Sequence, residues 1–324
     1  MNDSIYQVTV LIPTYNRAER LKVAISSVLN QTYQNLVLIV SDNASTDNTE
    51  NVVTEFASKD SRIKYVRQEK NMGMVENFNS ALKLVNTTFF CFLSDDDYYL
   101  DTFLTEAVDI FKTNNKIGFT VFACPEVKEK ISDITKNVLD FWPKEGLYEP
   151  GEAIGLATTG YHPIISACLF HERVIPDIYF SKQVESISDL PVLIALVDKY
   201  QFYVSKNIAM YFVRHDGAAG NVLDLKAWAN LDSYILNNIK LSIQAKKSVI
   251  KHITPKIRQI LFDHYIYYLS NFNVAELWKL KKLIFLRRDR FIIIYNIYLY
   301  LITTIISRVK RFVINIIKFV LGRK

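Results

Sequence analysis

The chain has 324 residues, of which 50% are apolar or aromatic and 22% are charged, so its composition excludes wholesale disorder and allows a substantial core. Its net charge of +6 is unevenly placed: residues 281–324 hold eleven lysines and arginines against one acid, Asp289, so the preceding 280 residues carry −4. This asymmetry favours an anionic partner for the tail alone. Three widely spaced cysteines indicate neither a zinc site nor a disulfide framework. No secretory signal is expected at the N-terminus.

Strand and helix patterns alternate through the first 124 residues. Runs of β-branched and aromatic residues predict strands at 8–12, 36–40, 63–66, 89–93 and 117–123. Apolar residues at helical spacing predict helices over about 17–30, 47–56, 75–85 and 100–111. Asn16, with Glu19 three residues on, is expected to cap the first helix. This alternation predicts a doubly wound, mostly parallel sheet.

Polar clusters follow four of these strands, at 14–17, 42, 71–73 and 95–97. Ligands of such sheets bind beyond the carboxyl ends of the strands, so we expect the four clusters to share one crevice. Neither a GxGxxG nor a GxxxxGK[ST] pattern occurs, which argues against a dinucleotide fingerprint and a Walker loop.

The three consecutive aspartates Asp95, Asp96 and Asp97 come directly after an apolar, aromatic strand. In extended chain, Asp95 and Asp97 would project to one side and Asp96 to the other. Two carboxylates about 6 Å apart repel by roughly 3 kcal/mol at an effective dielectric near 20. Two explanations stay open: solvated loop acids or a helix cap, and a site for a hard divalent cation such as Mg²⁺ or Mn²⁺.

Four motifs in order carry a family resemblance: VLIPTYNR ending at Arg17, VSDNASTD ending at Asp47, the asparagine-rich segment 71–82, and FLSDDD ending at Asp97. Together they resemble the family 2 glycosyltransferases over roughly residues 7–215. The resemblance implies a GT-A fold, Rossmann-like with a mostly parallel sheet flanked by helices. It also implies transfer of a sugar from a nucleotide-sugar donor.

The resemblance implies roles for the matching positions. Those lining the nucleotide pocket would be Pro13, Thr14, Tyr15 and Arg17. Asp42 would accept a hydrogen bond from the base, and Asn71 and Gly73 would approach the base and ribose. Many relatives carry an arginine where this chain has Phe78, so contacts made by that arginine are not carried over.

The aspartates would form the DxD motif of the family. Asp95 and Asp96 would contact the donor, while Asp97 and Asp95 would hold Mn²⁺ or Mg²⁺, with Asp97 the more direct ligand. His215 follows a strand-like segment and is a candidate third ligand; phosphate contact or a surface role is the alternative.

Asp189 begins an apolar helical pattern that includes Leu190, Leu193, Ile194 and Val197. It is either a simple helix cap or, as the resemblance implies, the general base that faces the acceptor. Glu185 is the substitute for that role.

Two regions are expected: a GT-A domain at 1–222, with a nucleotide-binding half (about 1–124) and an acceptor half (about 125–222), and a helical C-terminal region at 223–324. Residues 291–306 carry no formal charge, but a helix of that length is about 24 Å, short of the ~30 Å hydrocarbon core. Between 309 and 321 apolar residues repeat at helical spacing among basic ones. We therefore expect the tail, about 283–324, to bind an anionic membrane surface. The alternative is a core helix or an oligomerisation helix, which would give a homo-oligomer. A helix that spans the membrane ranks third.

The expected function is that of a metal-dependent, inverting glycosyltransferase with hexosyl or N-acetylhexosaminyl specificity. It would use a UDP-sugar and a glycan or lipid-linked glycan acceptor in cell-surface polysaccharide synthesis, in the cytoplasm and peripherally on the inner face of the cell membrane. A sugar nucleotidyltransferase is an alternative, weakened because the loop after the first strand is not glycine-rich. A non-catalytic membrane scaffold is another, weakened because the acids are all present. Nucleic-acid binding is not expected, because the tail's basic residues alternate with a wide aliphatic face.

Overall fold

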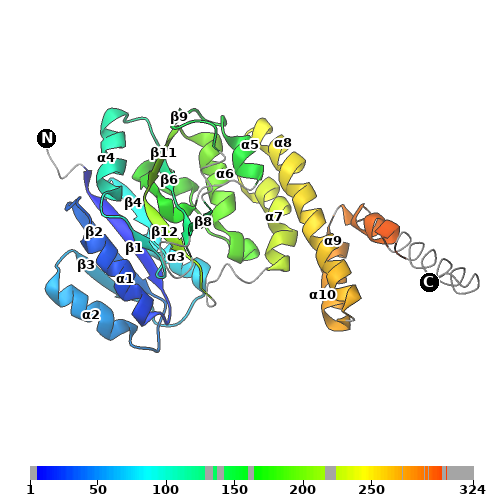
Figure 1. Cartoon of the computed structure of the whole chain (residues 1–324), viewed down its shortest axis with the longest axis horizontal. Coiled ribbons are helices and arrows are strands. Elements are labelled where there is room, and N and C mark those ends of the chain that lie inside the picture. Colours follow the sequence, from blue (N-terminus) through cyan, green and yellow to red (C-terminus); the bar gives the residue numbers. More distant parts are fainter. Residues whose placement is uncertain are drawn as a thin grey trace, which may run out of the picture.

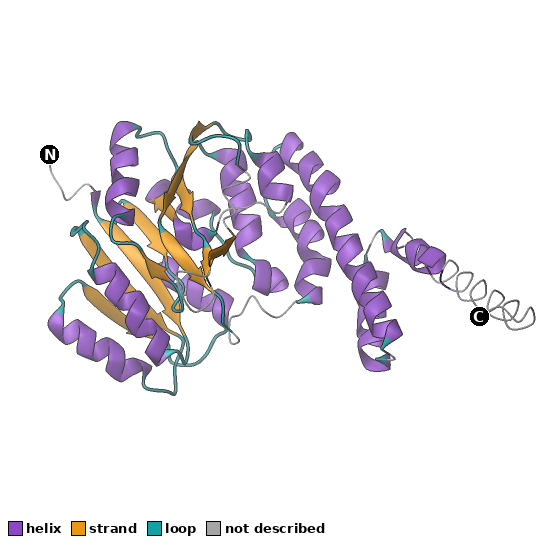
Figure 2. Cartoon of the chain, viewed as in Figure 1, coloured by secondary structure: helices purple, strands orange, loops and turns teal. Residues whose placement is uncertain are grey.

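A computed structural model describes residues 6–127, 134–136, 142–159, 164–215, 224–271, 273–287, 289–290, 292–300 and 304. Its centre is an eight-stranded sheet in the order β3-β2-β1-β4-β10-β6-β11-β9, with helices on both faces (Figures 1 and 2). A smaller sheet has the order β5-β12-β7-β8.

The first half of the chain alternates strands and helices as predicted. Its elements are β1 (Val8–Thr14), α1 (Ala18–Leu29), β2 (Leu36–Asp42), α2 (Thr49–Lys59), β3 (Ile63–Arg67), α3 (Met74–Leu82), β4 (Phe89–Phe92), β5 (Tyr98–Tyr99), α4 (Phe103–Thr113) and β6 (Phe119–Ala123). Strand β1 pairs in parallel with both β2 and β4, and β2 pairs in parallel with β3. Every residue of β1 and β4 is buried, because helices cover both faces of this part of the sheet. The prediction of a mostly parallel sheet is confirmed.

The second half inserts antiparallel strands. Its elements are β7 (Glu126–Val127), β8 (Ile134–Lys136), β9 (Gly146–Tyr148), α5 (Ile154–Thr159), the 3₁₀ turn η4 (Ile165–Ala167), β10 (Cys168–His171), the 3₁₀ turns η5 (Glu172–Asp177) and η6 (Lys182–Ile187), α6 (Asp189–Lys199), β11 (Phe202–Ile208) and β12 (Met210–Val213). Strand β10 lies antiparallel between β4 and β6, and β9 is antiparallel to β11.

Only helices are described after residue 224. They are α7 (Leu225–Asn238), α8 (Ile243–Ser248), the π-helical segment η8 (Val249–Ile253), α9 (Thr254–Ser270), α10 (Val274–Leu286) and a helix at 292–300. Helix α7 packs against η6, α9 and α10, and α9 and α10 extend away from the sheet (Figure 1). Within the described part of the chain, no helix is both long and apolar enough to cross a membrane. The amphipathic repeat predicted at 309–321 lies outside the described residues.

A buried ion-pair cluster holds these helices together. Arg287 is 8% exposed, and its guanidinium contacts Asp232 of α7 at 2.8 Å and Asp289 at 2.7 Å. Asp289 also pairs with Arg258 of α9 at 2.6 Å. Removal of one partner from such a buried cluster would leave an uncompensated buried charge. The cluster therefore holds residues 287 and 289, which follow α10, against α7 and α9.

Two local predictions were wrong. Asn16 does not cap α1: the N-cap is Arg17, and Asn16 adopts a positive φ of 55°. The helix expected at 100–111 is present but begins at Phe103, because the backbone N–H of Leu100 donates to the carbonyl of Ala209 next to the pairing of β5 with β12.

Candidate active site

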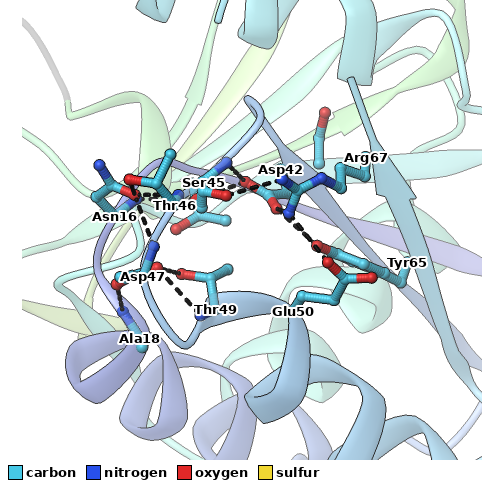
Figure 3. Close-up of polar contacts among 12 residues, drawn as sticks. Asn16, Ala18, Asp42, Ser45, Thr46, Asp47, Thr49, Glu50, Tyr65 and Arg67 are labelled. Atoms are coloured by element: carbon cyan, nitrogen blue, oxygen red, sulfur yellow. Dashed lines mark hydrogen bonds and ion pairs between the residues drawn. The ribbon is translucent and has the colours of Figure 1, made fainter. Parts of the chain in front are cut away.

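The loops after β1 and β2 are tied together by two polar side chains (Figure 3). The Asn16 Oδ1 atom accepts hydrogen bonds from the backbone N–H of Thr46 at 2.7 Å and of Asp47 at 3.3 Å. The Asp47 carboxylate accepts one from the backbone N–H of Ala18 at 3.1 Å and two from Thr49, at 3.0 and 2.6 Å. Burial raises the pKa of Asp47, but the hydrogen bonds from Thr49 and Ala18 outweigh it and lower the pKa overall. Asp47 therefore caps α1 and α2 together.

Asp42, at the end of β2, is fully buried and fully hydrogen-bonded. Its Oδ1 atom accepts hydrogen bonds from the backbone N–H and the hydroxyl of Ser45, at 2.9 and 2.5 Å. Its Oδ2 atom accepts them from the Tyr65 hydroxyl at 2.6 Å and the Arg67 guanidinium at 3.3 Å (Figure 3). Burial, followed by the hydrogen bond to Asp42, raises the pKa of Tyr65. The predicted contact between Asp42 and a nucleotide base stays a prediction.

A cavity of about 320 Å³ opens at the carboxyl ends of β1, β2 and β4. It is lined by Pro13, Thr14, Tyr15, Arg17, Asn43, Asn71, Gly73, Met74, Asn77, Phe78, Ser94, Asp95 and Asp96. Of the predicted donor-binding residues, all except Asp42 line it. Sequence reasoning did not assign Asn43, Met74, Asn77 or Ser94, although Asn43 follows Asp42 in one of the recognised motifs. We refer to this space as the donor cavity.

Backbone geometry shapes one wall of the donor cavity. Gly73 has a φ of +89°, which side-chain-bearing residues rarely adopt, and it precedes the first residue of α3. The Asn71 Oδ1 atom accepts hydrogen bonds from the backbone N–H of Gly73 and from the Asn43 side chain, both at 2.9 Å. Asn43 in turn accepts one from the backbone N–H of Met72 at 2.9 Å. These contacts hold the loop before α3 against the end of β2.

The aspartates form a tight turn, because the backbone N–H of Asp97 donates to the carbonyl of Ser94 at 3.2 Å. The extended geometry assumed for Asp95 to Asp97 was therefore wrong. Asp95 and Asp96 line the donor cavity, whereas Asp97 is 1% exposed and does not line it.

Asp95 and Asp96 contact groups from distant parts of the chain. Asp95 accepts a hydrogen bond from the Thr14 hydroxyl at 2.7 Å and lies 3.5 Å from the Arg17 guanidinium. Burial raises the pKa of Asp95 to about 6 despite Arg17. Asp96 forms an ion pair with Arg17 and contacts the His215 Nε2 atom at 3.0 Å.

Pairing of β5 with β12 brings the segment before His215 to the aspartate turn. Tyr98 of β5 stands opposite Tyr211 of β12, so the chain that follows β12 runs back past the turn. The Asp97 Oδ1 atom accepts a hydrogen bond from the backbone N–H of Val213 at 2.8 Å. The Asp97 Oδ2 atom is buried and has no hydrogen-bond partner among the described residues. Burial, and then the charge of Asp96, raise the pKa of Asp97 well above its ordinary value.

The predicted metal ligands Asp95, Asp97 and His215 are not assembled into one cluster. Among the residues that the structure describes, no group of three or more His, Cys, Asp and Glu side chains is placed to hold a metal ion, and His215 contacts Asp96 instead. The turn nevertheless suits a divalent cation, because Asp97 carries an unbonded buried oxygen. Mg²⁺ is commonly held by one or two carboxylates together with substrate phosphates, so a preformed three-residue cage is not required.

A second cavity, of about 470 Å³, shares Met74 and Phe78 with the donor cavity. It is lined by Met74, Val75, Phe78, Ile165, Phe180, Glu185, Ser186, Ser188, Asp189 and Asp224. We refer to it as the acceptor-side cavity. The ring of Phe78 packs against those of Phe92 and Phe180, with centroids 5.4 and 5.3 Å apart. Phe78 thus forms an apolar partition between the two cavities.

Asp189 is the first residue of α6 and is partly exposed. Ser188 is the N-cap, and no side chain caps this helix. The described residues supply no hydrogen bond or ion pair to the carboxylate of Asp189, so the structure does not support a simple capping role. The Glu185 Oε1 atom lies 3.6 Å from the position that a Cβ atom would take on Gly73. Glu185 therefore stands where the two cavities meet.

Comparison with known proteins identifies relatives. The model of the family described as "Glycosyl transferase family 2" matches residues 9–202. The chain is 39% identical over 110 residues to the Escherichia coli UDP-Glc:alpha-D-GlcNAc-diphosphoundecaprenol beta-1,3-glucosyltransferase WfgD, covering 34% of this chain and 43% of that one. It is 40% identical over 95 residues to a Campylobacter jejuni GalNAc(5)-diNAcBac-PP-undecaprenol beta-1,3-glucosyltransferase, covering 29% of this chain and 31% of that one. These matches thus span less than half of either relative.

Two solved structures show the same fold at low identity. Staphylococcus aureus TarS 1-349 in complex with UDP-GlcNAc matches with a TM-score of 0.61 and 16% identity, covering 80% of each chain. The mannosyltransferase PcManGT from Pyrobaculum calidifontis, in complex with GDP-Man and Mn2+, matches with a TM-score of 0.57 and 16% identity, covering 93% of this chain and 86% of that one. With the sheet topology, these likenesses confirm the predicted GT-A fold.

Proposed function

The chain belongs to the family 2 glycosyltransferases, and on that premise we propose that it transfers a hexosyl or N-acetylhexosaminyl group from a UDP-sugar to a hydroxyl of a glycan or lipid-linked glycan, with inversion at the anomeric carbon. The observation that carries this proposal is the pair of adjoining cavities that share Met74 and Phe78. The relatives named as undecaprenol-linked glucosyltransferases support the donor and acceptor classes. The family match does not favour the nucleotidyltransferase and scaffold alternatives.

In this proposal the donor cavity holds the nucleoside diphosphate. Arg17 is the one cation among the described residues that line it, and it would offset diphosphate charge. Asp95 and Asp97 would hold Mn²⁺ or Mg²⁺. His215 would stay next to this site because it contacts Asp96. A divalent cation bound there would stabilise the charge that develops on the leaving diphosphate.

The acceptor-side cavity would place the attacking hydroxyl near Asp189. This carboxylate has no recorded protein partner among the described residues and lines the cavity, so it is free to accept the hydroxyl proton. The hydroxyl oxygen then bonds to the anomeric carbon as the bond to the diphosphate breaks on the opposite face. General-base assistance of this kind contributes typically ~10²–10⁴-fold to the rate. Glu185 is the alternative base.

A screen of nucleotide-sugars tests the proposal. The full chain is incubated with UDP- and GDP-linked sugars, Mn²⁺ or Mg²⁺ and hydroxyl acceptors, and nucleotide release is measured. We expect release with a UDP-sugar that increases with acceptor and falls when a chelator is added. Release of pyrophosphate from a nucleoside triphosphate and a sugar phosphate, without transfer, would contradict the proposal.

We also propose that the chain divides into a GT-A domain at 1–222 and a helical region at 223–324 whose tail binds an anionic membrane surface on the cytoplasmic face. The described part of this region exposes large apolar side chains: Trp278, Phe285 and Leu286 on α10, and Ile292, Tyr295 and Tyr298 beyond it. The Lys281 ammonium lies 5.0 Å from the Trp278 ring and 5.8 Å from the Phe285 ring. Basic residues among exposed aromatics are typical of membrane interfaces, although a second copy of the chain is the alternative partner.

A matched pair of variants tests membrane attachment. The double variant Trp278→Ser/Phe285→Ser removes exposed aromatics of α10, and Ile243→Ser removes an apolar side chain of similar exposure on α8. We expect the first to reduce cosedimentation with vesicles containing phosphatidylglycerol and the second to leave it unchanged. Equal cosedimentation of both variants and the wild type would contradict attachment through α10. Loss of a dimer in sedimentation analysis would assign this surface to self-association.

A further inference from the structure

We propose that Asn79 is a positioning residue, which holds the segment that carries Glu185 and Asp189 in register with the donor cavity. Its side chain joins α3 to that segment through two buried hydrogen bonds with Phe180. The two residues are 101 positions apart in the sequence, so no local motif indicates this contact. The inference rests on the proposed function, because it concerns how the acceptor-side carboxylates are placed for transfer.

One side chain bonds both backbone groups of Phe180. Asn79 lies in α3 and is 7% exposed. Its Nδ2 atom donates to the carbonyl of Phe180 at 2.9 Å, and its Oδ1 atom accepts from the backbone N–H of Phe180 at 3.1 Å. Phe180 lies between η5 and η6 and belongs to no helix or strand. Within the described part of the chain, these two backbone groups therefore depend on Asn79 for their pairing.

A second buried asparagine bonds α3 to the ends of β1 and β2. The Asn77 Oδ1 atom accepts a hydrogen bond from the Ser41 hydroxyl at 2.8 Å. Its Nδ2 atom donates to the carbonyls of Ser41 at 2.9 Å and Thr14 at 3.4 Å. Successive residues of an α-helix are about 100° apart, so Asn77 and Asn79 project from roughly opposite faces of α3. The helix is thus bonded to the strand ends on one face and to Phe180 on the other.

The segment that follows Phe180 supplies most of the polar wall of the acceptor-side cavity. Four of its residues line that cavity: Glu185, Ser186, Ser188 and Asp189. The Glu185 Oε1 atom lies 3.6 Å from the position that a Cβ atom would take on Gly73, which lines the donor cavity. A small displacement of η6 therefore changes the distance between this carboxylate and the donor cavity. The placement of Phe180, directly before η6, sets that distance.

Apolar packing alone does not fix this placement. The ring of Phe180 packs against those of Phe78 and Phe92, with centroids 5.3 and 5.6 Å apart. Apolar contact is non-directional, whereas hydrogen bonds weaken steeply away from linear geometry. Loss of the Asn79 side chain would leave a buried N–H and a buried carbonyl unpaired, which favours a displaced backbone that exposes them to water. A misplacement of about 1 Å can cost roughly 10²-fold in rate.

Two other polar contacts of η6 do not replace this one. The Lys182 ammonium lies 3.6 Å from the Glu76 carboxylate, and each side chain is more than a third exposed. Exposed ion pairs contribute little to structure. The Asn230 side chain of α7 donates to the carbonyl of Gln183 at 3.4 Å, which joins η6 to α7 and not to α3.

Two alanine variants of the full chain test the proposal. Asn79→Ala removes the contact with Phe180, and Asn77→Ala, its matched control, removes the contact with the strand ends. UDP affinity is measured with Mn²⁺ by calorimetry, and turnover with the UDP-sugar and acceptor that the nucleotide-sugar screen selects. We expect Asn79→Ala to reduce turnover about tenfold or more while UDP affinity stays within about twofold, and Asn77→Ala to weaken UDP binding about threefold or more.

A merely structural role of Asn79 predicts a different result, in which both variants lose UDP affinity and turnover together. That result, or wild-type turnover in Asn79→Ala, would overturn the proposal. If Asn79→Ala does not fold, Asn79→Gln takes its place, because it keeps both polar groups on a side chain that is one methylene longer. Displacement of Phe180 should then reduce turnover in the same way, and wild-type turnover in Asn79→Gln would contradict the proposal.

Amide hydrogen exchange provides a measurement that does not require transfer. The backbone N–H of Phe180 should be protected in the wild type, and exchange across 180–187 should become about tenfold or more faster in Asn79→Ala. An unprotected N–H of Phe180 in the wild type would overturn the proposal. Absence of transfer by the wild type would contradict the proposed function instead, because hydrogen exchange and UDP affinity still report on the Asn79 contact.

Discussion

Two groups of acidic residues, Asp42 with Asp47 and Asp97 with Asp189, differ in how many protein hydrogen bonds their carboxylate oxygens accept. Asp42, at the end of β2, and Asp47, in the loop after it, accept hydrogen bonds at both carboxylate oxygens from the protein itself (Figure 3). Asp97, in the same turn as Asp95 and Asp96, keeps one buried oxygen without a hydrogen bond, and the Asp189 carboxylate has no protein partner among the described residues. Buried polar groups are normally paired, so the unpaired Asp97 oxygen is a candidate contact for a ligand, whereas the partly exposed Asp189 carboxylate is accessible to water.

This difference predicts which acids contribute to folding stability and which contribute to ligand binding or turnover. A satisfied acid contributes hydrogen bonds to the fold, and its removal should reduce the free energy of unfolding. A buried acid without its partner costs stability, so its removal should affect ligand binding or turnover more than folding. The following substitutions test that division, from the largest expected effect to the smallest.

Asp189→Asn should reduce turnover by ~10²–10⁴-fold while UDP affinity stays within about twofold, because the amide cannot accept the hydroxyl proton. Steady-state kinetics and UDP titration measure the two quantities. Glu185→Gln is the matched comparison from the same cavity. A larger loss of turnover in Glu185→Gln than in Asp189→Asn would assign the base to Glu185.

Asp95→Asn should stabilise the ligand-free protein at neutral pH. Burial raises the pKa of Asp95 to about 6, above the value of about 3.9 expected in the unfolded chain. A raised folded-state pKa contributes stability below about pH 4 that is lost as the pH rises through about 6. The variant should therefore gain about 2–3 kcal/mol relative to the wild type between pH 4 and pH 7.5.

Urea unfolding in chelator at both pH values measures this gain. Asp109→Asn, at an exposed position of α4, is the control and should show no pH-dependent difference. A constant difference between Asp95→Asn and the wild type at the two pH values would contradict an unfavourable burial of this carboxylate.

Asp47→Ala should lower the free energy of unfolding by about 2 kcal/mol, because it removes the side-chain cap of α1 and that of α2 together. Denaturant unfolding provides the measurement, and Asp109→Ala, which loses only an exposed ion pair, should change it by less than about 0.5 kcal/mol. Equal losses of unfolding free energy in the two variants would contradict the claim that Asp47 stabilises the fold more than an exposed acid does.

Tyr65→Phe should have the smallest effect, about 1 kcal/mol of unfolding free energy, because Asp42 loses one of its donors and keeps Ser45 and Arg67. UDP affinity is measured in parallel. If UDP affinity rose markedly while stability stayed constant, Asp42 would be restrained by Tyr65 from contacting the base.

The sequence predicted the strands β1, β2 and β4 well, because the runs that form them are largely apolar and are buried on both faces. It also placed Asp95, Asn71 and Arg17 at one edge, since parallel strands end on the same side of a sheet. The resemblance to a known family supplied their expected roles.

Contacts between residues that are distant in the sequence determine the features that the sequence did not predict. Asparagine commonly caps helices, yet the Asn16 side chain accepts a hydrogen bond from the loop after β2. Asp47, which lies in that loop, caps α1 instead. The aspartates were treated as extended chain, but pairing of β5 with β12 forces a turn before Tyr98. Phe78 separates the two cavities because its ring packs against that of Phe180. Phe180 is distant in the sequence, and no local pattern links the two residues.

Calorimetric titration of UDP in the presence and absence of Mn²⁺ tests most directly whether the unpaired acids serve a ligand. The wild type and Asp189→Asn should bind UDP more tightly with Mn²⁺ than without it. Asp97→Asn should lose that metal-dependent gain, by tenfold or more in affinity, because it replaces the buried carboxylate that has an unbonded oxygen. A metal-dependent gain of the same size in Asp97→Asn and the wild type would contradict the account.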